Sequence, residues 1–225
     1  MGMEQEDRES AFSRIEALLS VKSSSGKGNG RGGKFEELQS LLSPEQSLLR
    51  DIKRQIGGTF SGQNLVLCDP SNTKDAMSAL MKLALENGKV PVLVLTGMNY
   101  KVALGMIAAA KVSENKVFIV DTVSKSIIKT KETDRIFFVD SLRNLTQMEI
   151  TVFKLIEKDL NSCFIFDSID VLQLYHDDKV IGKFAYSLTK LLHRHKRAGF
   201  YLLNRKSLLS KLNQFADSAV ELKRI

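Results

Sequence analysis

The chain has 225 residues, 43% of them hydrophobic, and a formal net charge of +7, which is typical of a globular protein with one sizeable core domain and some additional elements. Its longest apolar runs, such as 90–96, are far shorter than the roughly 20 residues that are needed to cross a bilayer, and the acidic segment 4–9 is unlike a signal peptide. This argues against a membrane protein, and we expect a soluble, cytoplasmic one. The positive charge and a pI of about 9.3 are compatible with an acidic partner, although a solvated basic surface is the commoner explanation.

The first 34 residues contain two segments of different character. Residues 1–21 are expected to contain an amphipathic helix, because apolar residues recur at helical spacing in 10–20 and Ser10 is placed as a possible N-cap. Residues 22–34 are rich in Gly, Ser and Lys, and we expect them to form a flexible linker because this composition cannot repay the entropy of ordering. Within it, Arg31-Gly32-Gly33 is similar to the RGG repeats of RNA-binding tails, but a single copy is weak evidence for nucleic-acid binding.

The linker also contains a formal match to the phosphate-binding motif GxxxxGK, at Gly28–Lys34. Phe35 follows at the position where Ser or Thr would bind magnesium, and no strand precedes the match to support a phosphate cradle. We therefore reject this segment as a P-loop.

Residues 35–225 are expected to form one α/β domain, which begins with a helical lead-in over 35–58. Apolar residues at helical spacing are interrupted at Ser43-Pro44, where Ser43 can cap a new helix and proline is tolerated in a first turn. Two consecutive helices are therefore predicted, and Gly57-Gly58 ends the second.

From Asn64 onward, short apolar runs alternate with longer helical patterns. The predicted strands are 65–68, 90–96, 116–120, 135–139, 163–166, 199–203 and 218–222. The predicted helices between them are 73–87, 100–111, 144–160 and 180–196. Such alternation predicts a mostly parallel sheet with right-handed crossovers and helices on both faces. The run 163–166 is apolar on both faces, and we take it as the central strand.

The two cysteines, Cys68 and Cys163, lie at the exit of one predicted strand and at the entry of another. In neighbouring parallel strands these positions are at opposite edges of the sheet, too far apart for a disulfide. We expect both to be reduced core residues.

Four of the predicted strands end in an aspartate: Asp69, Asp121, Asp140 and Asp167. The carboxyl ends of parallel strands face one crevice, in which ligands bind in open α/β sheets. One interpretation is an acidic rim that holds Mg²⁺ or a basic ligand. For each aspartate taken singly, the other interpretation is a strand terminator or helix cap. Asp167 is the strongest candidate for the ligand of a metal-nucleotide.

Residues 57–225 resemble the KaiC/RadA branch of the RecA-type ATPases, in particular the archaeal KaiC-like proteins. The resemblance rests on the order and spacing of several motifs: Asp167-Ser168 as a Walker B-like element after a strand, 144–146 (NLT), 174–187 (LYHDDKVIGKFAYS), 215–217 (FAD) and 219–222 (AVEL). It implies a three-layer RecA-like α/β domain with a mostly parallel sheet.

The resemblance places the Walker A loop after the first core strand, in the segment 68–75 (CDPSNTKD). Aligning Lys74 with the P-loop lysine puts Cys68 and Thr73 at the two glycines. Asp75 then stands at the Ser or Thr that coordinates magnesium. Glycines are needed there because the loop uses strained conformations and brings N–H groups against phosphate, which a Cβ obstructs. The Walker A motif is therefore degenerate. Lys74 has a simpler explanation as a solvent-exposed lysine in a first helical turn, although the helix dipole disfavours it there.

The resemblance also places the base that activates water after the next strand, and there the segment 96–100 (TGMNY) contains no carboxylate. Loss of both elements predicts a pseudo-ATPase without catalytic residues, because hydrolysis needs phosphate, metal and water to be positioned together. No cofactor is expected unless ATP with Mg²⁺ binds without turnover. The candidate contacts for a nucleotide or another anion would then be Thr73, Lys74, Asp75, Asp167 and Ser168, with Asp167 as the magnesium ligand.

The histidines do not predict a zinc site, because His193 and His195 are two apart on a helix and point about 200° from each other. Basic residues near the end of the same helix form either a solvated last turn, which the helix dipole favours, or a nucleic-acid patch. They are Lys190, Arg194, Lys196 and Arg197, with Arg205, Lys206 and Lys211 beyond the next strand.

We therefore expect a non-catalytic RecA/KaiC-like domain that acts as a regulatory or scaffolding protein-interaction module. It would self-associate or bind a protein partner through its N-terminal helix. The alternatives are a nucleotide or anion receptor without turnover, and a basic nucleic-acid-binding protein.

Overall fold

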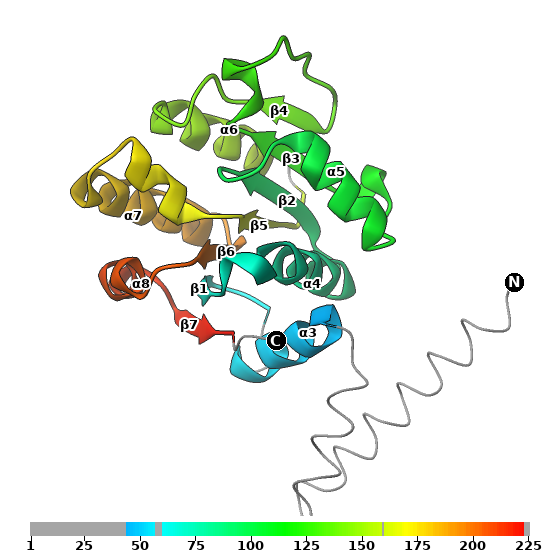
Figure 1. The fold of residues 1–225 in the computed structure, drawn as a ribbon, viewed down its shortest axis with the longest axis vertical. Helices are drawn as coiled ribbons and strands as arrows, with labels where there is room; N and C mark the ends of the chain where they lie inside the picture. Colours follow the sequence, from blue (N-terminus) through cyan, green and yellow to red (C-terminus); the bar gives the residue numbers. More distant parts are fainter. Residues whose placement is uncertain (1–43, 57–59, 159, 223–225) are drawn as a thin grey trace, which may run out of the picture. The chain divides into compact units, whose positions relative to one another are not determined.

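The computed structural model describes residues 44–56, 60–158 and 160–222 (Figure 1). All of them belong to one unit, Leu42–Ile225. The expected helix in 10–20, the linker 22–34, the first lead-in helix and the helix end at Gly57-Gly58 lie outside the described residues. Within the described part of the chain, no helix is long and apolar enough to span a membrane.

A single sheet of seven parallel strands runs through the domain in the order β4-β3-β2-β5-β6-β1-β7 (Figure 1). The strands are β1 (Gln63–Leu67), β2 (Val90–Leu95), β3 (Phe118–Asp121), β4 (Ile136–Phe138), β5 (Ser162–Phe166), β6 (Ala198–Leu203) and β7 (Ser218–Glu221). The strand β5 is the fourth of the seven, which confirms it as the central strand. Each predicted strand is present, with ends that differ from the prediction by at most two residues.

Of the described helices, one precedes β1, and the others lie in the connections between strands. They are α3 (Pro44–Gln55), α4 (Thr73–Glu86), α5 (Tyr100–Ala109), α6 (Leu145–Glu157), α7 (Asp178–Arg194) and α8 (Lys206–Leu212), with short 3-10 turns η2 (Pro70–Asn72), η3 (Glu114–Lys116), η4 (Ser124–Ser126), η5 (Ile169–Leu174) and η6 (Asn213–Phe215). The helix α3 is the second of the two helices that the lead-in predicts. The helix α8 was not predicted, because two turns with only a few apolar residues give too short a pattern to detect.

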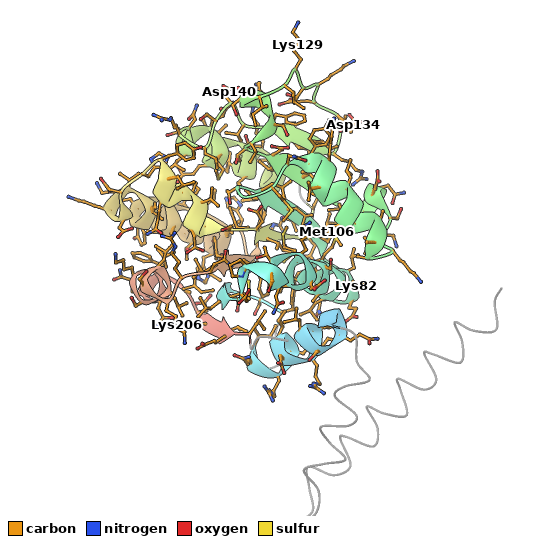
Figure 2. All side chains as sticks on the ribbon, viewed as in Figure 1. Lys82, Met106, Lys129, Asp134, Asp140 and Lys206 are labelled. Carbon is orange, nitrogen blue, oxygen red and sulfur yellow. The ribbon has the colours of Figure 1, made fainter. Side chains whose placement is uncertain are left out.

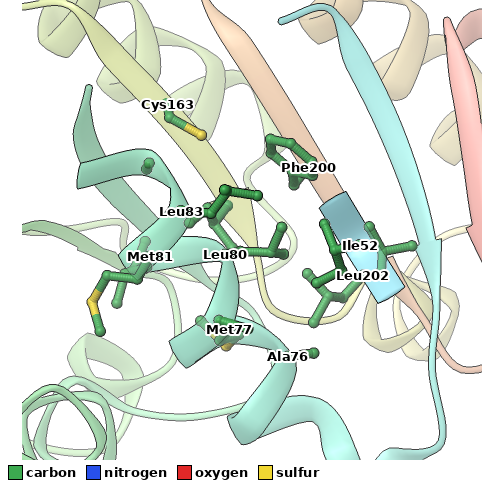
Figure 3. Packing of buried hydrophobic residues seen from close by; sticks show 14 of the residues in the cluster. Ile52, Ala76, Met77, Leu80, Met81, Leu83, Cys163, Phe200 and Leu202 are labelled. Atoms are coloured by element: carbon green, nitrogen blue, oxygen red, sulfur yellow. The ribbon is translucent and has the colours of Figure 1, made fainter. Parts of the chain in front are cut away.

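Two apolar cores lie on opposite faces of the sheet. Residues of α3, α4 and α5 form one core, and residues of α6, α7 and α8 form the other. Successive strand residues alternate between them, so that in β5 Cys163 and Ile165 belong to the first core while Phe164 and Phe166 belong to the second. Figure 3 shows this first core, in which Leu80 of α4 and Ile52 of α3 pack with strand residues such as Phe200 of β6. This three-layer α/β arrangement confirms the predicted fold class.

The two cysteines are free and buried, as the sequence analysis predicts. Their strands are not neighbours, however, because β6 lies between β1 and β5. Burial raises the pKa of the Cys68 thiol to about 11, so this thiol is neutral at physiological pH and is not a reactive nucleophile.

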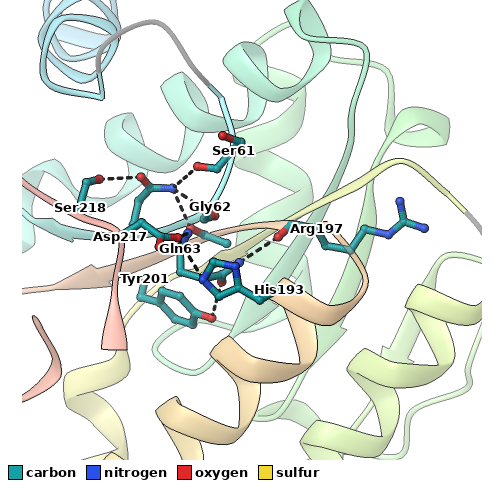
Figure 4. A network of polar contacts seen from close by, with 10 residues as sticks. Ser61, Gly62, Gln63, His193, Arg197, Tyr201, Asp217 and Ser218 are labelled. Atoms are coloured by element: carbon teal, nitrogen blue, oxygen red, sulfur yellow. Dashed lines mark hydrogen bonds and ion pairs between the residues drawn. The ribbon is translucent and has the colours of Figure 1, made fainter. Parts of the chain in front are cut away.

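A polar network joins β1, β6 and β7 at their amino ends (Figure 4). The fully buried side chain of Gln63 donates from Nε2 to the Arg197 carbonyl at 2.8 Å and accepts from the Tyr201 hydroxyl at 2.9 Å. The Gln63 backbone N–H donates to Asp217 Oδ2 at 2.7 Å. Close approach of this side chain requires a glycine at 199, where an added Cβ would lie 2.2 Å from Gln63 Oε1.

Replacing Gly199 with alanine should therefore destabilise the protein, by about 1–3 kcal/mol as for other overpacked sites, because Gln63 cannot move without losing its partners. Gly105→Ala is the matched control, since a Cβ there meets nothing within 4 Å and alanine is the better helix former. Urea denaturation measures both. Unfolding midpoints that are equal for the two variants would contradict the role assigned to Gly199.

Candidate functional site

The carboxyl edge of the sheet contains two places where neighbouring strands send their connections to opposite faces. The strand β1 leads into α4 on one face while its neighbour β6 leads into α8 on the other, and β2 and β5 likewise lead into α5 and α7. Ligands bind at such switch points in open α/β sheets. We call them the β1–β6 and the β2–β5 switch points, and the sequence-predicted candidates lie at both.

The carboxylate of Asp167 occupies the β2–β5 switch point. Its Oδ1 accepts from the backbone N–H of Thr96 at 2.6 Å, and its Oδ2 accepts from the N–H groups of Gly97 and Met98 at 2.9 and 3.0 Å. Thr96 Oγ1 lies 2.7 Å from Oδ1 and 2.5 Å from the Ser168 carbonyl oxygen, and its single proton serves one of them at a time. Three consecutive N–H groups that converge on one carboxylate form an anion-binding nest, and here the anion belongs to the chain itself.

The N–H groups around Asp167 explain how a carboxylate can be buried at this position. Asp167 is only 1% exposed, and an isolated carboxylate in such a place is expensive. Burial raises the pKa of the Asp167 carboxyl, whereas the hydrogen bonds from Thr96, Gly97 and Met98 lower it. The backbone N–H groups of Thr96, Gly97 and Met98 all donate to the carboxylate, which is the surrounding that an ionised carboxylate requires. Asp167 therefore fastens the loop after β2 to the end of the central strand.

The segment aligned with the Walker A loop is a closed turn at the β1–β6 switch point. Asp69 caps the 3-10 turn η2, and its Oδ1 accepts from the backbone N–H and the hydroxyl of Ser71 at 3.0 and 2.7 Å. The N–H of Asn72 donates to the Asp69 carbonyl at 2.9 Å, and the N–H of Thr73 donates to the Pro70 carbonyl. Pro70 has no N–H to offer. Hydrogen bonds within the turn thus occupy the N–H groups of residues 71–73.

Asn204, at the end of β6, joins the two switch points. Its side-chain Nδ2 donates to the Cys68 carbonyl at 3.0 Å, and its Oδ1 lies 3.5 Å from the Ser168 hydroxyl. Its backbone N–H donates to Asp170 Oδ2 at 2.5 Å. Polar contacts therefore run across the ends of β1, β6 and β5.

The predicted nucleotide or anion contacts lie apart from one another. Thr73, Lys74 and Asp75 are in the first turn of α4, beside β1, whereas Asp167 and Ser168 follow β5, with β6 between. Lys74 is exposed and has no hydrogen-bond or ion-pair partner among the described residues. Binding of an anion by these residues stays a prediction.

Two buried polar atoms at this edge are without hydrogen-bond partners within the described residues, Asn72 Nδ2 and Asp170 Oδ1. Asn72 is 8% exposed and precedes α4, so an unused donor lies next to the first turn that contains Lys74. Burial raises the pKa of the Asp170 carboxyl, and the N–H of Asn204 opposes that shift.

The other carboxylates of the predicted acidic rim are also engaged locally. Asp121 is fully buried and accepts from the N–H groups of Tyr100, Val123 and Ser124, each at 2.7 Å. Asp140 is exposed and forms an ion pair with Lys125 at 2.5 Å (Figure 2). Asp121 ends β3 and Asp167 directly follows β5, whereas Asp69 and Asp140 stand two residues beyond β1 and β4. The four carboxylates do not converge. Within the described residues, no group of three His, Cys, Asp or Glu side chains is placed to hold a metal.

The sequence analysis did not identify Asn204, Asn72 or Asp170. Asn204 follows an apolar strand in the same way as the four aspartates do, so extending that rule from aspartate to other polar residues would have found it. No local pattern marks Asn72 or Asp170.

No protein-family model matches the chain, and no curated protein does. Among solved structures, a KaiC-like protein from the hyperthermophilic archaeon Pyrococcus horikoshii OT3 is similar to it, with a TM-score of 0.55 and 16% sequence identity. The match covers 73% of this chain and 74% of that one. The chain has a KaiC-like, RecA-type fold. At this low sequence identity, the structural similarity shows the fold and nothing further.

Asp167→Asn should destabilise the KaiC-like domain by about 3 kcal/mol, because an amide nitrogen cannot accept from the loop and a buried N–H without a partner costs about 1–3 kcal/mol. The matched control is Asp140→Asn, which changes an exposed carboxylate at the end of β4 and should leave stability nearly unchanged. Urea denaturation without nucleotide or metal tests both. A mutant that is as stable as the wild type, or more stable, would instead indicate a carboxylate reserved for a ligand.

Proposed function

We propose that this protein is a non-catalytic RecA/KaiC-like domain that acts as a regulatory or scaffolding protein-interaction module. The observation that carries the proposal is that hydrogen bonds within the chain occupy both places where a RecA-type ATPase would handle phosphate and water. Phosphoryl transfer depends almost entirely on positioning and electrostatic stabilisation, and both need donors that are free to meet the ligand.

The turn after β1 supports this proposal most directly. A phosphate cradle needs backbone N–H groups that point at the ligand, but those of Ser71 to Thr73 are used within the turn. The Asp69 carboxylate already serves as the anion at Ser71, and it would repel a phosphate at the same place.

The loop after β2 supports the proposal independently. The segment 96–100 has no carboxylate to accept a proton from water. The carboxylate nearest to it, Asp167, accepts from three of its N–H groups and is 1% exposed. Asp167 would have to release that loop before it could bind a metal.

Exposed apolar side chains favour a protein partner. Leu174, at the end of η5, is 75% exposed, and Ile127, in the connection between β3 and β4, is 74% exposed. A partner that covers them removes apolar surface from water, which stabilises the complex. The apolar residues at helical spacing in the segment 10–20 predict a further surface of the same kind.

Self-association through the segment 10–20 is testable by light scattering on the full chain. We expect a mass that is a multiple of the 25.2 kDa monomer and that falls to the monomer mass in Leu18→Asp. Ser13→Asp adds the same charge on the polar side of that segment and should leave the assembly intact. A wild-type protein that is monomeric at high concentration would overturn self-association as the scaffolding role.

A nucleotide or anion receptor without turnover is the second candidate, favoured by the unused donor Asn72 Nδ2 beside the exposed Lys74. If this candidate is right, ATP, ADP or a dinucleotide raises the Tm by mass action, and Lys74→Ala abolishes the shift. Lys101→Ala, in the first turn of α5, is the matched control. Magnesium-dependent ATP hydrolysis that disappears in Lys74→Ala and in Asp167→Ala would overturn the non-catalytic proposal. An unchanged Tm with every nucleotide would remove the receptor.

A further inference from the structure

The outer side of α7 carries a stripe of basic side chains around one aromatic ring. Lys179, Lys183, Tyr186 and Lys190 are spaced by four, three and four residues, which places them on one side of the helix. All four are exposed. The opposite side of α7 is buried in the second core and includes Ile181, Phe184, Leu188 and Leu192. We call the four exposed residues the α7 stripe.

The stripe borders a groove of about 560 Å³ between α7 and the segment formed by α8 and η6, elements that lie next to each other in Figure 1. Lys179, Lys183 and Tyr186 line one side of the groove, and Lys211 and Phe215 line the other. The rings of Tyr186 and Phe215 are 5.6 Å apart between centroids and inclined by 57°. Tyr186 is 51% exposed, so Phe215 supports one side of its ring while much of the remainder stays open to solvent.

The charge at this groove is strongly positive. Asp178 also lines it, but forms an ion pair with Lys211. Lys179 and Lys183 have no ion-pair partner within the described residues. The Nζ of Lys190 lies 6.0 Å from the Tyr186 ring centroid, at the outer limit of a cation–π contact. Of the four lysines in the stripe and the groove lining, only Lys211 forms an ion pair within the part of the chain that the structure describes.

The sequence also suggested a basic patch around Arg194 and Lys206, and two of its residues have partners within the domain. Lys206 forms an ion pair with Glu221, and Arg205 donates to Gln173 Oε1 at 3.3 Å. Both contacts lie at the surface, where the Lys206 side chain is 74% exposed. Of the other residues of that predicted patch, Lys190 belongs to the α7 stripe and Lys211 lines the groove, while Arg194 and Lys196 are exposed at the end of the same helix.

We infer that the α7 stripe and its groove bind a single-stranded nucleic acid. At 1.5 Å per residue, Lys179 and Lys190 are about 16 Å apart along the helix axis, a length that spans several phosphates of one strand. The open ring of Tyr186 offers a stacking surface for a base, as in proteins that bind single strands without sequence preference. A duplex keeps its bases stacked inside and cannot use that ring. An acidic peptide would satisfy the lysines but would leave the ring pair unexplained.

The inference concerns a different surface from the proposed scaffold, and the two can fail separately. It is tested with the full chain by fluorescence anisotropy, using a labelled oligothymidylate strand and a duplex of equal length. We expect binding to the single strand at low salt, weaker binding to the duplex, and affinity that falls steeply as salt is added.

Variants of Tyr186 and of the lysines separate the contribution of base stacking from that of phosphate contacts. Tyr186→Ala should weaken binding of the single strand about fivefold to a hundredfold, as expected for the loss of one stacked base, whereas Tyr186→Phe should bind as the wild type does. The double variant Lys179→Gln/Lys183→Gln should lower the slope of log affinity against log salt by about 1.4, at roughly 0.7 for each phosphate contact on a single strand.

The control for net charge is Lys101→Gln/Lys129→Gln, which removes the same two charges from α5 and from the loop before β4 (Figure 2). Its salt slope should equal that of the wild type.

Absence of salt-dependent binding, equal losses in the two double variants, or equal affinity for the duplex would overturn the inference. If polyglutamate bound as tightly as the single strand, the partner of this surface would be an acidic protein instead. If binding is lost only when Lys27, Arg31 and Lys34 of the linker are neutralised, the linker rather than the α7 stripe is the site.

Discussion

The carboxylate of Asp167, held by the N–H groups of the loop after β2, is the interaction on which the carboxyl edge of the sheet depends. An aspartate that is 1% exposed has to be surrounded by donors, since a buried charge without them would cost more than most other contacts contribute. The loop must therefore turn toward β5 so that Thr96, Gly97 and Met98 all face one carboxylate. That turn sets the direction in which the chain enters α5, and Asp121 secures the same entry by accepting from the N–H of Tyr100.

The same physical device that binds phosphate in many α/β proteins is used here to bind the chain's own side chains. Convergent N–H groups attract anions whatever their source. At the end of β2 the anion is Asp167, and in the turn after β1 it is Asp69. A tethered carboxylate has a high effective concentration at its donors, so an external anion must displace it to bind. Because these carboxylates are part of the chain, the carboxyl edge of the sheet is held in one arrangement and does not change with a bound ligand. We therefore assign the function to other surfaces of the domain.

The fold was predictable from the sequence because its signals are local. A parallel sheet covered on both faces needs short strands without polar positions, and runs such as 163–166 show that directly. The candidate site was only partly predictable. Aspartates at strand ends were visible, but which ones turn inward depends on the loops that reach them. Asn204 contacts Cys68 only because β6 pairs with β1, and that strand order is a long-range property. The helix α8 escaped detection because its pattern is too short.

The position of α7 explains why its outer side can be chemically distinct from the rest of the domain. Its inner side includes Phe184, Leu188 and Leu192, and these contacts fix the helix whatever stands on the outside. Substitution of the outer residues is therefore nearly free of cost in stability, and nothing in the fold requires Lys179, Lys183, Tyr186 and Lys190 to align on one side. A cluster of lysines repels itself, and an exposed tyrosine ring gains little from water, so both are mildly unfavourable in the free protein. A strand of nucleic acid relieves both penalties at once, with phosphates for the lysines and a base for the ring. This complementarity distinguishes the α7 stripe from a merely solvated surface.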